Sequence, residues 1–134
     1  MNIIDAIITD IKKYEGISAV SFDASGMHIG MVALELDAEL QIGTKVLLKV
    51  KATNVALAKG INAQISIANQ LKAVVEDVAN GVILCSVKLN IQGTVIESII
   101  TQSSALSMDI KAGDELIALI KSNDISIASF EEKI

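Results

Sequence analysis

Aromatic residues, histidine and cysteine are scarce in this 134-residue chain, and each shortage excludes a class of protein. Aromatics make up 2% of the residues, and the formal net charge is −5. Nucleic-acid binding depends on a basic face or on stacking aromatics, so we expect no nucleic-acid partner. One histidine, His28, and one cysteine, Cys85, cannot supply a metal-ligand cluster, so no metal site is expected. We expect His28 at the surface or an interface and Cys85 as an inert core thiol.

Long apolar runs are also missing. No uninterrupted stretch approaches the roughly 18 residues that cross a membrane. The start of the chain, Met1–Asp5, lacks the basic segment that opens a signal peptide. A single cysteine fits a reducing compartment. The sequence therefore predicts a cytoplasmic protein with no membrane partner.

Catalytic motifs are missing as well. The sequence contains no nucleophile elbow and no glycine-rich phosphate loop. Glu76 and Asp77 are adjacent carboxylates, but neighbouring residues of a strand point to opposite faces, so we expect solvated charges. We therefore predict that the protein is not an enzyme.

What the sequence does contain is an internal repeat. The segment Val46–Ala58 matches Leu116–Ala128, and Lys51 aligns with Lys121 at a shift of 121 − 51 = 70 residues. Earlier matches, such as Asn2 with Asn69, are shifted by only 67 residues, so the first copy is three residues shorter. We predict two domains, residues 1–60 and 61–134, closely coupled because the joining segment is short and lacks proline.

Each copy is predicted to have five short strands, with a short helix after the third and a lysine at the centre of its closing strand. The expected strands are residues 2–11, 17–22 and 27–36, and then 69–79, 82–90 and 93–100, before the two closing segments. The helix of the second copy is expected at 102–108, and a short helical piece is expected after 27–36. The fold class is thus all-β with short helices, as two tandem five-stranded Greek-key barrels of the oligonucleotide/oligosaccharide-binding (OB) type.

Hydrophobic residues make up 51% of the chain. Small barrels bury too little of their own surface to be stable alone. This much apolar surface should pack against the other copy and against further subunits. We therefore predict a homo-oligomer, and favour a trimer over a dimer because it arranges six similar barrels in closed symmetry.

Small hydroxyls and amides gather around one lysine in the second copy. Ser66 and Asn69 open the copy, Thr101 and Ser104 open its helix, and Lys121-Ser122 follows the last apolar run. Taken singly, the helix-start hydroxyls are explained by capping and the lysine by an exposed position. Together they offer neutral donors and one cation without a carboxylate. That set suits a compact tetrahedral dianion, which needs a hydrogen bond on every oxygen.

At these residues the sequence resembles the molbindin family, the molybdate-binding domains of the wider TOBE type. The resemblance rests on Ser66-Ile-Ala-Asn-Gln-Leu, Thr101-x-x-Ser104 and Lys121-Ser-x-x-Ile125, and it covers nearly the whole chain as a tandem pair. It implies a molybdate site, with tungstate as a second ligand, between barrels of different subunits. One domain would supply Ser66, Ala68, Asn69, Lys121 and Ser122, and another would supply Thr101 and Ser104. The family usually has arginine where this chain has Ala68, so only a backbone N–H could donate there.

The resemblance implies a cytoplasmic oxyanion-binding protein for molybdenum storage or homeostasis. A sensor of this family needs a helix-turn-helix ahead of the pair, and because the chain starts directly at the first copy we expect a stand-alone protein. Two alternatives stay open. One is a protein–protein or regulatory module of molybdate transport or sensing with no ligand of its own. The other is an accessory of a molybdenum-cofactor enzyme, which would co-purify with pterin.

The second copy has more of the predicted oxyanion-binding residues than the first. Lys51 is retained in the first copy, but Ala52 replaces the serine that follows the lysine, and the Thr-x-x-Ser segment is missing. Each unpaired oxygen of a buried dianion keeps its desolvation penalty. We therefore expect the tighter sites in the second copy, with Lys51 and Ala52 lining at most a weaker site.

Overall fold

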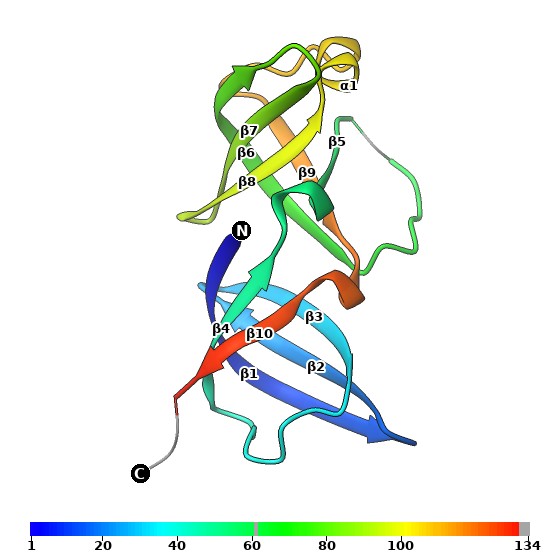
Figure 1. The fold of residues 1–134 in the computed structure, drawn as a ribbon, viewed down its shortest axis with the longest axis vertical. Coiled ribbons are helices and arrows are strands. Elements are labelled where there is room, and N and C mark those ends of the chain that lie inside the picture. Colours follow the sequence, from blue (N-terminus) through cyan, green and yellow to red (C-terminus); the bar gives the residue numbers. More distant parts are fainter. Residues whose placement is uncertain (61, 132–134) are drawn as a thin grey trace.

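The computed structural model describes residues 1–60 and 62–131. It contains two five-stranded antiparallel sheets stacked along the long axis of the molecule (Figure 1). The first sheet has the order β10-β4-β1-β2-β3 and the second β5-β9-β6-β7-β8. In each, three consecutive strands form a meander and a later strand pairs back with the first of them. This is Greek-key pairing, and it confirms the predicted OB-like fold class.

The elements have the following bounds. The first sheet contains β1 (Asn2–Tyr14), β2 (Ile17–Ala24), β3 (Met27–Leu34), β4 (Lys45–Val50) and β10 (Ser126–Phe130). The second contains β5 (Ala56–Ala58), β6 (Asn69–Asn80), β7 (Leu84–Ile91), β8 (Thr94–Thr101) and β9 (Glu115–Ile120). The helices are α1 (Gln102–Ser107) and the one-turn 3₁₀ helices η1 (Ala52–Asn54) and η2 (Ser122–Asp124).

Strand β1 confirms that the segment predicted at residues 2–11 is a strand and not a helix. Ile4 and Ile8 are buried, whereas Ile3 and Ile7 are exposed, so burial alternates with a period of two. A helix would have put all four on one apolar face. The hydrogen bonds of β1 to both β2 and β4 hold it at the centre of its sheet.

The buried apolar side chains of the two sheets form one continuous cluster. Fully buried residues of this cluster come from both copies, among them Phe22, Ile29, Leu48, Leu89 and Ile120. Each such side chain contributes about 1.5–3 kcal/mol when removed from water. Cys85 is buried in the same cluster, as predicted, while His28 is exposed on β3.

The two sheets exchange their closing strands. After β4 the chain crosses through η1 and adds β5 to the edge of the second sheet, and after β9 it crosses through η2 and adds β10 to the first (Figure 1). Each sheet thus takes one strand from across the boundary expected at residue 60. The prediction that each lysine lies at the centre of a closing strand is wrong. Lys51 and Lys121 lie at the crossings, each immediately before a 3₁₀ turn.

A reciprocal pair of asparagines joins the copies next to these crossings. The side-chain amide of Asn2 bonds both the N–H and the C=O of Glu97 in β8, at 2.8 Å each. The amide of Asn69 bonds the N–H and the C=O of Gly30 in β3, at 2.8 and 2.9 Å. Both asparagines are buried, so their side-chain amides need these partners. Together with the exchanged strands they confirm the prediction that the copies are closely coupled.

The three-residue difference between the copies falls where the sequence places it. Residues 35–44 connect β3 to β4, whereas the longer segment 102–114 connects β8 to β9 and contains α1. The short helical piece predicted in the first copy is wrong, because its connection makes turns only. Leu34 stands at the position of Thr101 and cannot cap a helix. Within residues 1–60 and 62–131, no helix is long and apolar enough to cross a membrane.

Candidate oxyanion site

A small hollow of about 170 Å³ lies where the linker meets the second crossing. It is lined by Ser66, Ile67 and Ala68 on one side and by Lys121, Ser122 and Asn123 on the other. Four of the predicted site residues are therefore brought together in one place: Ser66, Ala68, Lys121 and Ser122. Sequence reasoning missed Ile67 and Asn123, and its only signal for them was their position beside predicted residues.

The pairing of β6 with β9 explains why these two segments meet. The strands are antiparallel, and Asn69, the first residue of β6, faces Ile120, the last residue of β9. The residues just before β6 and just after β9 must therefore leave the sheet at the same end. The two halves of the hollow are separated by more than 50 positions in the sequence, yet this one pair of residues sets them side by side.

The lining of the hollow favours negatively charged ligands. It offers the Lys121 ammonium, two hydroxyls and the Asn123 side-chain amide, and no carboxylate lines it. Lys121 is exposed, and Ser122 is half-buried at the start of η2. A lining of hydrogen-bond donors around one cation favours a small anion over a cation.

Asn69 does not line this hollow but lies directly behind it. Its side chain is 2% exposed. Besides its two bonds to Gly30, its Nδ2 donates to the carbonyl of Ile120 at 3.0 Å. Ile120 immediately precedes Lys121, so Asn69 fixes the backbone from which the lysine emerges. The structure gives Asn69 a supporting position rather than a surface from which to touch a ligand.

Thr101 and Ser104 form a helix cap at the start of α1. The Thr101 hydroxyl accepts from the Ser104 N–H at 3.1 Å and donates to the Ser104 hydroxyl at 2.8 Å. Both residues are exposed, and neither lines the hollow. β6 and β8 run in the same direction, the hollow precedes β6, and α1 follows β8 (Figure 1). The cap and the hollow therefore lie at opposite ends of the second sheet and cannot act on one ion within a single chain.

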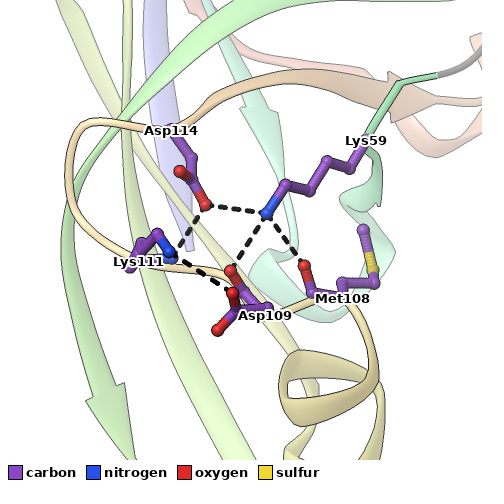
Figure 2. Close-up of polar contacts among 5 residues, drawn as sticks. All are labelled: Lys59, Met108, Asp109, Lys111 and Asp114. Carbon is purple, nitrogen blue, oxygen red and sulfur yellow. Dashed lines mark hydrogen bonds and ion pairs between the residues drawn. The ribbon is translucent and has the colours of Figure 1, made fainter.

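A lysine of the linker holds the far end of α1 in place (Figure 2). Lys59 Nζ donates to the carbonyls of Met108 and Asp109 at 2.9 and 3.0 Å and to Asp114 Oδ2 at 3.1 Å. The last carbonyls of a helix lack intrahelical partners, so a cation there is stabilising. The Lys111 backbone N–H, followed by the Lys59 side chain, lowers the pKa of Asp114 below its ordinary value.

The first copy keeps the lysine but not its surroundings. Lys51 and Lys121 have nearly the same backbone conformation, with φ and ψ of −66° and 137° against −65° and 144°. Beside Lys51 stands Ala52, which is buried and carries no donor on its side chain. The connection between β3 and β4 also has no counterpart of the Thr101-x-x-Ser104 segment.

Comparisons with known proteins agree with this architecture. The TOBE domain family matches residues 65–127. Molybdenum-pterin-binding protein 1 of Clostridium pasteurianum is 45% identical over 64 residues, which are 47% of this chain and 94% of that protein. A solved structure of the cytoplasmic molybdate-binding protein ModG, with molybdate bound, superimposes with a TM-score of 0.90 and 24% identity over 94% of each chain. The ModG likeness supports the tandem fold, while the two sequence matches support the resemblance seen in the site motifs. The chain belongs to the TOBE-domain family, in its molbindin type.

Proposed function

We propose that this protein binds molybdate, with tungstate as an alternative ligand, and that the hollow at Lys121 is the principal binding place. The observation that carries the proposal is the lining itself, which combines one ammonium with neutral donors and no carboxylate. The clostridial relative is named for molybdenum-pterin binding, and ModG was crystallised with molybdate. These relatives favour a molybdate-binding protein over a ligand-free interaction module.

The chemistry of the lining matches that of the ion. Molybdate is a compact tetrahedral dianion, and burying it requires hydrogen bonds on its oxygens. Lys121 supplies the charge, Ser66 and Ser122 supply hydroxyl donors, and the Ala68 backbone N–H stands where the family usually has arginine. Tungstate has nearly the same size and charge, so this set of donors does not separate the two ions.

One hollow covers only part of an ion, and we assign the remaining donors to a second copy of the chain. Thr101 and Ser104 lie at the opposite end of the sheet, so they would complete the hollow of a neighbouring subunit.

Exposed apolar side chains lie near Thr101 and Ser104. Val82 and Ile83 are 96% and 75% exposed at the β6–β7 turn, and Leu106 is 69% exposed on α1. The Gln102 N–H bonds the Ile83 carbonyl, which places the turn against the helix. Burying these side chains would favour association.

The assembly we propose is a closed homo-oligomer, a trimer rather than a dimer, in the cytoplasm. Head-to-tail contacts between hollow and helix are heterologous, and such contacts form a ring when the rotation between subunits closes. Storage or homeostasis of molybdenum, without catalysis, is the role we propose for this assembly.

Calorimetric titration with molybdate, tungstate and sulfate tests the binding step. We expect molybdate and tungstate to bind with similar affinity and sulfate to bind far more weakly. Wild-type protein that takes up no molybdate, or that binds sulfate equally well, would contradict the proposal.

A complementation experiment tests the shared site. Lys121→Ala subunits lack an intact hollow, and Thr101→Val/Ser104→Ala subunits lack an intact helix cap. Each variant alone should bind weakly. Mixed oligomers should regain a fraction of tight sites, because some interfaces then join an intact hollow to an intact cap. If co-refolded mixtures recover nothing while light scattering shows mixed oligomers, the site does not span two subunits.

A further inference from the structure

Gln70 holds the wall of the hollow from behind. Its side-chain Nε2 donates to the carbonyl of Ile65 at 3.2 Å and to the carbonyl of Ile67 at 3.0 Å. These two residues alternate with Ser66 and Ala68, which line the hollow. A primary amide has two N–H groups, so a single glutamine side chain can bond both carbonyls at once.

Gln70 acts from the side of the linker that faces away from the hollow. Together with Ile65 it lines a separate cavity of about 260 Å³ over β6 and β9, whose walls include Lys72 and Leu119. Ser66, Ile67 and Ala68 line the hollow and not this second cavity. Gln70 therefore bonds the carbonyls of Ile65 and Ile67 from the side of the second cavity, although Ile67 itself borders the hollow.

The segment has little else to fix it. Residues 62–68 belong to no strand or helix, and in the described part of the chain they make no backbone–backbone hydrogen bond. An irregular segment held by few bonds samples many conformations, and ordering it on ligand binding costs free energy. A side chain that orders it in advance removes part of that cost.

Carbonyl orientation also matters for the charge of the site. A carbonyl oxygen carries partial negative charge and would repel an oxyanion if it turned into the hollow. Bonding the two carbonyls to Gln70 occupies them, so that neither is free to turn toward an ion in the hollow. The same contact therefore sets both the shape and the polarity of this wall.

We propose that Gln70 is a positioning residue for the oxyanion hollow: it holds the Ser66–Ala68 segment so that this wall presents donors only. The inference rests on the proposed molybdate site. Gln70 itself touches no ligand, and it acts through the two carbonyls that it bonds.

The test compares Gln70→Met with wild type and with Gln64→Met. Methionine keeps the length of the side chain and removes the amide donor. Gln64 is an exposed glutamine of the same linker that lines neither cavity, so its replacement controls for a linker change of the same kind. Molybdate and sulfate affinities are measured by calorimetry, Tm is measured without ligand, and amide hydrogen exchange is followed at Ser66 and Ala68.

We expect Gln70→Met to weaken molybdate binding about tenfold, the size of effect found when a group that orients ligand-binding residues is removed. Sulfate binding should change little, so the preference for molybdate falls with it. Tm should stay within about 2 °C of wild type, because Gln70 is exposed and the linker lies outside both sheets. Exchange at Ser66 and Ala68 should become faster. Gln64→Met should match wild type in every measurement.

Each of the other outcomes refutes either the positioning role of Gln70 or the proposed function as well. If wild type binds molybdate and Gln70→Met binds it equally well, the positioning role is refuted and the proposed function stands. Weaker binding with a large fall in Tm, or an equal loss in Gln64→Met, also refutes it, because the effect is then general. If wild type binds no molybdate, the proposed function fails and the assignment of Gln70 fails with it.

Discussion

The two copies share a fold but not a surface. Lys51 and Lys121 have the same backbone conformation, and Asn2 and Asn69 make matching bonds to the opposite copy. The differences lie in the loops: the residue after the lysine, and the three residues and helix between the third and fourth strands. Loops tolerate such changes because few buried contacts depend on them. The copies thus separate what maintains the fold from what we propose binds the ion.

The largest expected effect concerns the asparagines that join the copies. Asn69→Ala leaves three backbone groups without their partner, namely the N–H and C=O of Gly30 and the C=O of Ile120. Asn2→Ala leaves two, both on Glu97. At about 1 kcal/mol for each lost bond, the free energy of unfolding should fall by about 3 kcal/mol for Asn69→Ala and about 2 kcal/mol for Asn2→Ala. Urea denaturation measures both. A larger loss in Asn2→Ala would show that the copies are not held as described.

The lysines give the second comparison. Lys121→Ala should weaken molybdate binding by about 1.5–3 kcal/mol, the cost of losing a hydrogen bond from a charged group. Lys51→Ala should change tight binding little, because the neighbouring Ala52 has no side-chain donor and the first copy has no Thr-x-x-Ser segment. Calorimetric titration of the two variants measures the difference. Loss of tight binding in Lys51→Ala with retention in Lys121→Ala would reverse the assignment of the copies.

A smaller effect is expected at the anchor of α1, which the first copy lacks. Lys59→Met removes the cation from the helix C-terminus and should lower stability by about 1 kcal/mol. The control is Lys111→Met on the same loop, whose ammonium pairs only with the exposed Asp109 carboxylate in the described part of the chain. That change should cost less. Thermal denaturation measures the loss of stability in the two variants. Equal shifts in Tm would argue against a specific role for Lys59.

The smallest effect is a pH dependence. The folded protein lowers the pKa of Asp114 from its ordinary value of 3.8, so the ionised carboxylate stabilises the fold above that value. This contribution is lost as the pH falls through the lowered pKa. Asp114→Asn should therefore be less stable than wild type at pH 6, and the difference should shrink at pH 3. Urea midpoints at both values measure it, with Asp109→Asn as a control of equal charge change. A gap that widens on acidification would contradict the assigned shift.

The sequence predicted most of the strands because burial alternates so regularly. The exchange of closing strands was not predicted, because the repeat assigns each closing segment to its own copy and carries no signal for a crossing. The error over the first helix has a similar origin: the repeat suggested a helix, but Leu34 and a shortened connection left nothing to begin one.

The candidate site was predictable in part. Four predicted residues line the hollow because the motif residues flank two paired strands, and the repeat had marked both segments. The role of Asn69 was not visible, since its partner Gly30 belongs to the other copy. Gln70 stood inside the quoted motif, but only the structure shows which carbonyls it bonds.

The exchanged strands also set an order of events during synthesis. Domains generally fold from the N-terminus as they leave the ribosome. Here the first sheet lacks its edge strand until Ser126–Phe130 emerges, although its other four strands lie within the first 50 residues. Until then β4 presents an unpaired edge, which is a template for pairing with another chain. A nascent chain that stalls before β10 emerges would therefore be prone to aggregate through the exposed edge of β4, although the first four strands of that sheet are synthesised early.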